Sequence, residues 1–249
     1  MRNLHILCGH GDAVVGKLLL KKVLRSILRY QGLTRILRQP FTPRVLLAIR
    51  PILRHWLGER DFTMIWAAFT LAFFAFLCCS EFTCRGTTSY SPSFDLSVSS
   101  ASFEPNLACP QRMSVFLQSS KTDAFRRGHT LVIACSPSPL CAVKAMRNYF
   151  LLARPQGPLF SFHSGRLLTR KSVVSLLRDA ARQAGLPYSS LKGHSFRIGA
   201  ASTAAAAGLP HWLIKVLGRW CSDCYQLYTH TPQNVLMSAA PRIARVTSY

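Results

Sequence analysis

The sequence predicts a mixed α/β domain that is mainly helical and carries a small antiparallel sheet. Three observations support this fold class. Apolar residues recur at helical spacing in several segments, beginning with residues 15–31, where Lys and Arg occupy the opposite side. Two strand-like runs, Ser114–Gln118 and Thr130–Cys135, are joined by a polar turn and predict a β-hairpin. Apolar residues make up 49% of the 249 residues, so the chain can bury a core.

The remaining elements follow from the same signals. Thr42-Pro43 opens a helical pattern over residues 43–57, and the apolar stretch from Met64 predicts a further helix. Residues 86–110 are rich in Ser, Thr and Pro and predict irregular chain with one short strand. After the hairpin we expect helices over Leu140–Ala153, from Thr169 to Ala184, and over Ser195–Ala207, Pro210–Leu217 and Ser222–Tyr228, with a short strand at Leu159–Phe162.

The stretch Met64–Cys79 is nearly all apolar and lies between Asp61 and Glu81. It is shorter than the roughly 18–20 residues that a transmembrane helix needs. A buried helix is therefore the preferred interpretation, and a membrane-associated protein built on this stretch stays open as an alternative.

The charge of the chain is strongly one-sided. Lys and Arg number 31 and Asp and Glu 9, giving a formal net charge of +22. A protein this basic repels itself unless an anionic partner is present, which favours nucleic acid first and a membrane surface second. A basic protein without a polyanionic partner is the remaining alternative.

The nine cysteines are scattered and odd in number, and no secretory signal opens the chain. We therefore expect reduced thiols in an intracellular compartment. Cys221 and Cys224 have the spacing of a metal-binding pair, but no second pair with fitting spacing follows, so no metal site is expected.

Residues suited to phosphodiester cleavage without a metal follow one another along the chain. His194 and Arg197 open an Ala-rich helix, Trp220 and Tyr228 come after it, and Lys121 lies in the hairpin turn. A tyrosine hydroxyl can hold a phosphate covalently, an arginine can donate to the transition state, and a lysine can protonate the leaving oxygen. Each residue alone has an ordinary structural explanation, whereas their joint order indicates this chemistry.

The segment Gly193–Pro232, GHSFRIGAASTAAAAGLPHWLIKVLGRWCSDCYQLYTHTP, closely resembles the second signature block of tyrosine recombinases. The residues of this segment are most similar to those of the recombinases of animal transposable elements of the DIRS and Crypton type. The turn SSKTDAFRRG resembles their lysine turn, and LAFFAFLCCSEFT resembles the segment with their first arginine. The resemblance covers about residues 40–232. It implies a tyrosine-recombinase catalytic domain over residues 41–232. This domain would be preceded by a basic helical remnant of a core-binding domain at residues 1–40 and followed by a tail at residues 233–249.

The resemblance also implies a role for each residue of this order. Tyr228 is expected to be the nucleophile, and Arg197 to clamp the phosphate. His194 is expected to handle a proton beside it. Trp220 would contact the scissile phosphate, and Lys121 would be the general acid.

One catalytic position departs from the family pattern. Where the family has Phe-Leu-Arg-x-x-Glu, this chain has Cys78 at the arginine position and Glu81 at the supporting acidic position. A thiol is a weak donor without charge, and removal of one preorganised donor typically lowers the rate by about 10²–10³. Arg85 lies beyond the end of the predicted helix and is not expected to replace the missing arginine.

The basic residues expected to contact DNA are Lys21, Lys22, Arg25, Arg29 and Arg219. Of the family's helical core-binding domain, only the helix at residues 15–31 has a counterpart here, so we expect weakened DNA binding.

The function that the sequence predicts is DNA recombination or integration by strand cleavage and rejoining through a phosphotyrosine intermediate, in a degenerate form. Double-stranded DNA is the expected partner, with a homo-oligomer assembled on it, a nuclear location, no cofactor and no membrane. The alternative is a transposon-derived protein that binds DNA without cutting it. Cys78 and the reduced N-terminal part favour the alternative, while the intact downstream residues favour catalysis.

Overall fold

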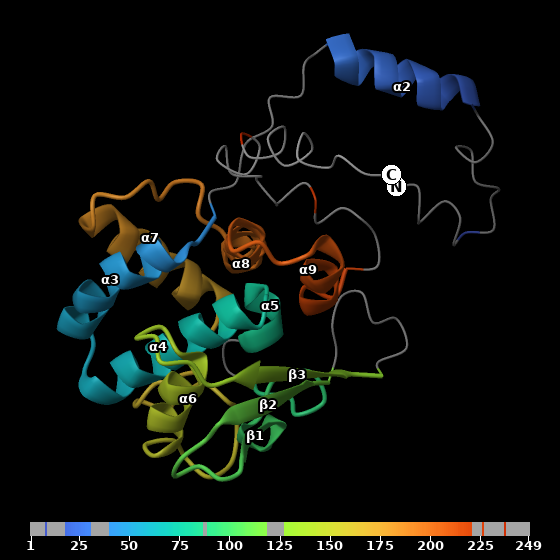
Figure 1. Ribbon diagram of the computed structural model, residues 1–249. Coiled ribbons are helices and arrows are strands. Elements are labelled where there is room, and N and C mark those ends of the chain that lie inside the picture. The colour runs from blue at the N-terminus through green and yellow to red at the C-terminus, as the bar shows by residue number, and fades with distance from the viewer. Residues whose placement is uncertain are drawn as a thin grey trace, which may run out of the picture. The chain divides into compact units, whose positions relative to one another are not determined.

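The computed structural model describes residues 8, 18–30, 40–86, 89–118, 127–220, 226 and 237. The chain divides into two units, residues 1–37 and residues 38–249. In the first unit lies α2 (Leu18–Tyr30), which follows the predicted periodicity (Figure 1). Its apolar residues Val23, Leu24 and Ile27 are exposed.

Helices make up most of the regular secondary structure described in the second unit. Its helices are α3 (Pro43–Trp56), α4 (Glu59–Phe74), α5 (Cys79–Phe82), α6 (Ala142–Phe150), α7 (Arg170–Gln183), α8 (Ser195–Ala206) and α9 (His211–Leu217), with a 3-10 turn at Val98–Ser100. Local signals set several of their ends. Thr169 caps α7 by accepting the backbone N–H of Ser172 at 3.2 Å. Gly208 follows α8 with φ +79°, a conformation that favours glycine and ends the helix.

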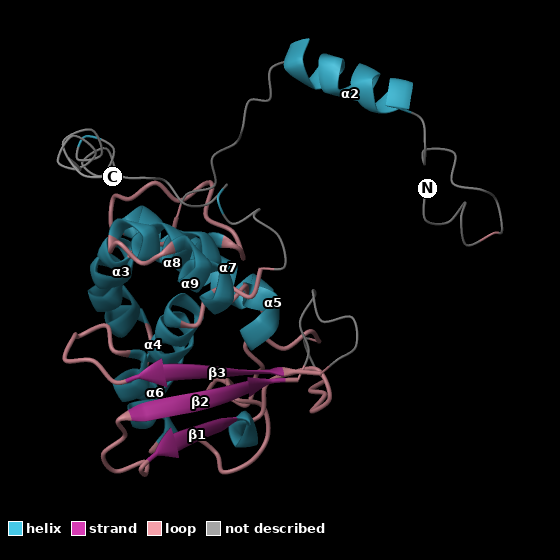
Figure 2. Ribbon diagram, turned by 45° about the vertical axis from the view of Figure 1, so that its right-hand side comes forward, coloured by secondary structure: helices cyan, strands magenta, loops and turns pink. Residues whose placement is uncertain are grey.

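The sheet is antiparallel with strand order β1 (Ala101–Glu104), β2 (Arg112–Leu117), β3 (His129–Ala134). On β2 the alternate residues Met113, Val115 and Leu117 are buried, as the two-residue period of a strand requires. Figure 2 shows the three strands as one layer beside the helical part of the unit. The predicted fold class, mainly helical with a small antiparallel sheet, is confirmed.

Two predicted elements differ from the structure. The predicted strand Leu159–Phe162 forms only an isolated bridge between Ser161 and Leu167. The helix predicted over Met64–Cys79 begins at Glu59 and ends at Phe74, before a turn in which Phe76 has φ +53°. The predicted helix Ser222–Tyr228 lies outside the described residues, apart from Gln226.

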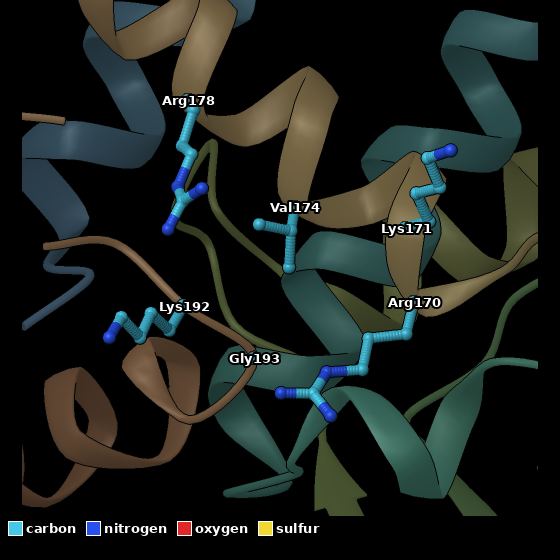
Figure 3. A pocket seen from close by; sticks show the side chains of 6 residues that line it. All are labelled: Arg170, Lys171, Val174, Arg178, Lys192 and Gly193. Atoms are coloured by element: carbon cyan, nitrogen blue, oxygen red, sulfur yellow. The ribbon is translucent and has the colours of Figure 1, made fainter. Parts of the chain in front are cut away.

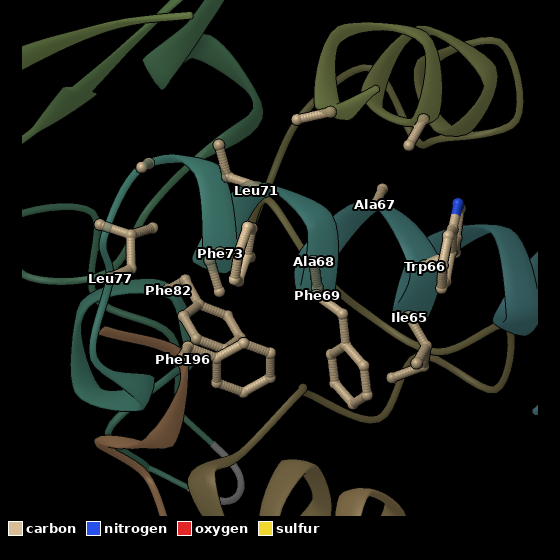
Figure 4. Close-up of a cluster of buried hydrophobic side chains, with 14 of the residues drawn as sticks. Ile65, Trp66, Ala67, Ala68, Phe69, Leu71, Phe73, Leu77, Phe82 and Phe196 are labelled. Atoms are coloured by element: carbon tan, nitrogen blue, oxygen red, sulfur yellow. The ribbon is translucent and has the colours of Figure 1, made fainter. Parts of the chain in front are cut away.

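Helix α4 runs through the hydrophobic core. Nearly all of its residues from Phe62 to Phe73 are buried, against side chains of the other helices (Figure 4). Within the described residues, no helix combines the length and the apolar character needed to cross a membrane.

Phe196 on α8 is the centre of an aromatic cluster. Its ring centroid lies 4.5 Å from that of Phe41, 5.2 Å from that of Phe69 and 5.8 Å from that of Phe82. These contacts join the segment before α3, the helix α4 and the helix α5 to α8. Figure 4 shows Phe69, Phe82 and Phe196 of this cluster. Because Phe196 is fixed in the core, the backbone of the next residue, Arg197, is fixed as well.

Gly199 allows α8 to approach the segment before α3. A Cβ atom at this position would lie 2.0 Å from the carbonyl oxygen of Phe41 and 2.7 Å from its backbone nitrogen. The same segment is bound to α8 by a hydrogen bond from Phe41 N–H to the carbonyl of Ser195, at 3.0 Å. Glycine is therefore required for this close contact.

We predict that Gly199→Ala lowers the free energy of unfolding by about 3 kcal/mol, because backbone atoms must move to admit the methyl group. The matched control is Gly58→Ala, since a Cβ at Gly58 would have no atom within 4 Å. The control should change the free energy by less than about 1 kcal/mol. Urea unfolding measures both, and equal effects would contradict the close contact.

Candidate active site

A single turn of helix places the carboxylate of Glu81. Cys78 is the N-cap of α5, and Glu81 folds back so that its Oε2 accepts the backbone N–H of Cys78 at 2.7 Å. This capping arrangement satisfies a backbone donor at the helix start. It also fixes the direction of the carboxylate, whose side chain is only 8% exposed.

Arg197 from α8 binds this carboxylate. Its Nη2 donates to Oε1 and Oε2 of Glu81 at 3.0 and 2.7 Å, and its Nε donates to the carbonyl of Phe76 at 2.7 Å. The side chain keeps 19% of its surface exposed. Arg197 is therefore held at two points, while part of its side chain stays exposed.

Arg219, which follows α9, binds the same carboxylate from another direction. Its Nη2 donates to Oε1 of Glu81 at 3.0 Å, and its Nη1 donates to the carbonyl of Ala75 at 3.1 Å. Burial lowers the pKa of this guanidinium, and Glu81 opposes the shift. Arg219 was predicted to contact DNA, but its side chain is only 9% exposed, and its backbone, with φ +55°, lies in a left-handed turn. Its place in the structure is that of a buried partner of Glu81.

The two arginines also bind the turn that follows α4. A helix leaves its last carbonyls without partners inside the helix. Here the carbonyls of Ala75 and Phe76, in the turn after α4, accept the side chains of Arg219 and Arg197. The turn is thereby stabilised although Phe76 adopts a left-handed conformation that is uncommon for a bulky residue.

Cys78 contacts the imidazole of His194. The Sγ atom lies 2.9 Å from Nδ1 of His194, the exposed N-cap residue of α8. Burial raises the pKa of the Cys78 thiol to about 11. At neutral pH the thiol therefore keeps its proton, and position 78 brings no positive charge to this site.

Trp220 completes the group. Its ring lies 5.8 Å from Cζ of Arg197 and 6.3 Å from the ring of Phe76, to which it is nearly perpendicular. Arg197, His194 and Trp220, which the sequence order singled out, thus lie in one place around Cys78 and Glu81. We call these five residues the Glu81 corner.

Other predicted residues cannot be placed in this corner. Lys121 and Tyr228 lie outside the described residues, and so do the side chains of Lys21, Arg25 and Arg29. Lys22 is exposed on α2. Their roles stay predictions.

A basic pocket beside the corner was not foreseen. It has a volume of about 470 Å³ and is lined by Arg170, Lys171, Val174, Arg178, Lys192 and Gly193. Figure 3 shows Arg170 and Arg178 on either side of Val174 on α7, with Lys192 opposite them. The carbonyl of Gly193 accepts the backbone N–H of Cys79 at 2.9 Å, which joins the pocket to the corner. The spacing of four between residues 170, 174 and 178, which puts them on one helix face, is the signal that could have revealed it.

We predict that Glu81→Gln lowers the free energy of unfolding by about 3–5 kcal/mol, because two buried guanidiniums lose their shared counter-charge. The matched control is Glu59→Gln. Glu59 pairs with Arg54 at 3.6 Å, but both side chains are more than half exposed. The control should therefore cost less than about 1 kcal/mol. Urea unfolding measures the free energy of unfolding of both variants. If Glu81→Gln lowers it no more than Glu59→Gln does, the corner does not depend on the charge of Glu81.

Comparison of the sequence with protein-family models and with curated proteins finds no match. Comparison of the structure with solved structures finds site-specific recombinases. A XerH site-specific recombinase bound to a palindromic difH substrate matches with a TM-score of 0.58 and 11% identity, over 83% of this chain and 53% of the recombinase. A XerA recombinase matches with a TM-score of 0.57 and 15% identity, over 93% and 75% of the two chains. The Tn1549 transposon integrase in complex with transposon right-end DNA matches with a TM-score of 0.52 and 15% identity, over 83% of this chain and 66% of the integrase chain.

The chain spans about half the length of the XerH structure. At these identities the comparison establishes the architecture alone. The chain shares with part of the XerH, XerA and Tn1549 structures the architecture of a mainly helical domain with a small antiparallel sheet.

Proposed function

We propose that this chain binds double-stranded DNA and carries a tyrosine-recombinase active site, degenerate at Cys78. The observation that carries the proposal is the Glu81 corner. There Arg197, His194 and Trp220 lie together on a fold that site-specific recombinases also have.

The proposed reaction needs a nucleophile, a phosphate clamp and a proton donor. The hydroxyl of Tyr228 would give up its proton to His194 and attack a DNA phosphorus, and the 5′-oxygen would leave with a proton from Lys121. Arg197 would donate to the phosphate oxygens as negative charge develops on them. A 5′-hydroxyl of a partner strand would then attack the phosphotyrosine and rejoin the DNA. Because the phosphotyrosine bond conserves the energy of the broken bond, this scheme includes neither a metal nor a nucleotide.

The basic pocket supports DNA as the substrate. Arg170, Lys171, Arg178 and Lys192 place positive side chains around an opening beside the corner. The chain as a whole carries a formal net charge of +22. Clustered cations of this kind bind the phosphate backbone through charge and do not depend on base sequence.

The second candidate function is DNA binding without cleavage. The uncharged thiol of Cys78, 2.9 Å from His194, favours it, because the phosphate would lack a second guanidinium at that position. Both candidates share the partner and the surface, and they differ in whether a covalent intermediate forms.

The finer features of the proposal rest on the sequence. The amino-acid sequence of Gly193–Pro232 supports an origin of this chain among DIRS- or Crypton-type transposons. Assembly as a homo-oligomer on DNA and a nuclear location are parts of the same proposal, because recombination joins two DNA sites and chromosomal DNA is in the nucleus.

We predict DNA binding that is weak, nonspecific and steeply dependent on salt. Titrations with a random-sequence duplex between roughly 50 and 200 mM salt should show a strong loss of affinity. Lys192→Gln should reduce the slope of log K against log salt by about 1, since one phosphate contact is lost. Arg182→Gln, on α7 but outside the pocket and paired with Asp179 at 3.7 Å, is the control and should leave the slope unchanged. A salt-independent affinity would contradict the proposed surface.

We predict that Cys78→Arg raises the yield of covalent protein–DNA adduct by roughly 10²-fold, because a second guanidinium would stabilise the transition state. The assay uses a pool of nicked suicide duplexes of randomised sequence, with DNA binding measured in parallel. Tyr228→Phe should abolish the adduct in both backgrounds. Cys109→Arg adds the same charge at an exposed position and should have no effect. If the unmodified chain forms as much adduct as Cys78→Arg, position 78 is not the position of the missing arginine.

A further inference from the structure

Two cysteines outside the Glu81 corner face each other across a short loop. Cys135 directly follows β3, and Cys141 is the N-cap of α6. Their Sγ atoms are 3.7 Å apart, and both are free thiols. The intervening segment, residues 136–140, contains Pro137 and Pro139, which restrict the backbone and so favour the close approach of the two ends.

The surroundings of the two sulfur atoms differ, so their chemistry differs. Cys141 Sγ accepts the backbone N–H of Ser136 at 3.2 Å and lies at the start of α6, where the helix dipole favours negative charge. Burial acts to raise the pKa of the Cys141 thiol, but hydrogen bonds from the backbone N–H groups of Ser136 and Lys144 outweigh it and lower the pKa. For Cys135, burial and the contact with Cys141 raise the pKa of the thiol. Cys141 is thus the more acidic thiol of the pair, and Cys135 the less acidic one.

A pocket reaches one member of this pair, Cys141. It has a volume of about 420 Å³ and is lined by Cys141 together with Arg50, Arg54, Ser138 and Lys144. The wall carries three cationic residues and one anionic residue, Glu59, so its net positive charge favours a thiolate there. Cys141 itself is only 4% exposed, so a small reagent such as a peroxide would reach it through this pocket.

We propose that Cys135 and Cys141 form a reversible dithiol–disulfide pair that peroxides oxidise, and that its disulfide ties the end of β3 to the start of α6. The geometry requires the two sulfur atoms to move from 3.7 Å to about 2.05 Å, a change within the reach of a surface loop. This modification site is separate from the proposed recombinase chemistry.

The oxidation proceeds in two steps. The thiolate of Cys141 attacks one oxygen of hydrogen peroxide, the O–O bond breaks, and a sulfenic acid and hydroxide form; the hydroxide takes up a proton to give water. The sulfur of Cys135 then attacks the sulfur of Cys141, the S–O bond breaks, and a second water leaves with the proton of Cys135. The two thiols lose two electrons and two protons in all, and the peroxide is reduced to two waters. A dithiol reductant such as dithiothreitol reverses the reaction by thiol–disulfide exchange.

Mass spectrometry of the full chain tests this proposal directly. Trypsin releases the peptide Gly128–Lys144, in which Cys135 and Cys141 are the only cysteines. After brief exposure to hydrogen peroxide and alkylation, this peptide should be lighter by two hydrogen atoms and carry no alkyl group. Dithiothreitol should restore two alkylation sites. The free thiols of this peptide should disappear roughly tenfold faster than that of exposed Cys109, which the peptide of residues 86–112 reports.

Single substitutions identify the role of each sulfur. In Cys135→Ser, a sulfenic acid on Cys141 should accumulate and be trapped by dimedone, whereas in Cys141→Ser residue 135 should give little or no dimedone adduct. Cys109→Ser is the matched control and should leave oxidation of Gly128–Lys144 unchanged. Retention of two alkylation sites while Cys109 oxidises would overturn the proposal. Disulfides that join two copies of the peptide in place of the internal one would overturn it as well.

Discussion

The candidate site depends on the hydrogen bonds and ion pairs that the carboxylate of Glu81 forms. It accepts hydrogen bonds from the start of α5, from Arg197 on α8 and from Arg219 after α9. Two guanidiniums with little exposure to water need such a partner, because an unpaired buried charge is strongly destabilising. Segments far apart in the sequence are therefore joined by one side chain, and the positions of His194 and Trp220 follow from the elements that it joins.

The hydrophobic core and this polar group support one another. Phe196 packs among Phe41, Phe69 and Phe82, so α8 has a fixed rotation about its axis. That rotation points the neighbouring Arg197 toward Glu81 at 2.7 Å. The apolar contacts thus provide the rigidity that the proposed phosphate-binding role of Arg197 needs, and the ion pairs satisfy the charges that the core itself could not accept.

The sequence predicted those features that depend on nearby residues. The helical period and the cap at Thr169 located α7, and alternation together with a polar turn located the hairpin. The order of His194, Arg197 and Trp220 indicated a shared site. The end of α4 could not be predicted, because the turn at Ala75 and Phe76 is stabilised by side chains 144 and 121 positions away. The burial of Arg219 and the contact between Cys135 and Cys141 likewise depend on tertiary structure, which periodicity and spacing do not contain.

The charges around Glu81 also influence which residues position 78 can accept during evolution. Two guanidiniums already share one carboxylate, so a third cation at position 78 would add like-charge repulsion in a place shielded from water. A neutral thiol, which also fits a buried position, removes that repulsion. At this position the requirements of folding and of the proposed phosphate chemistry are therefore opposed. If the chain is the non-cleaving DNA-binding protein of the second proposal, stability alone favours the thiol, and an arginine at position 78 must overcome an energetic bias of the fold itself.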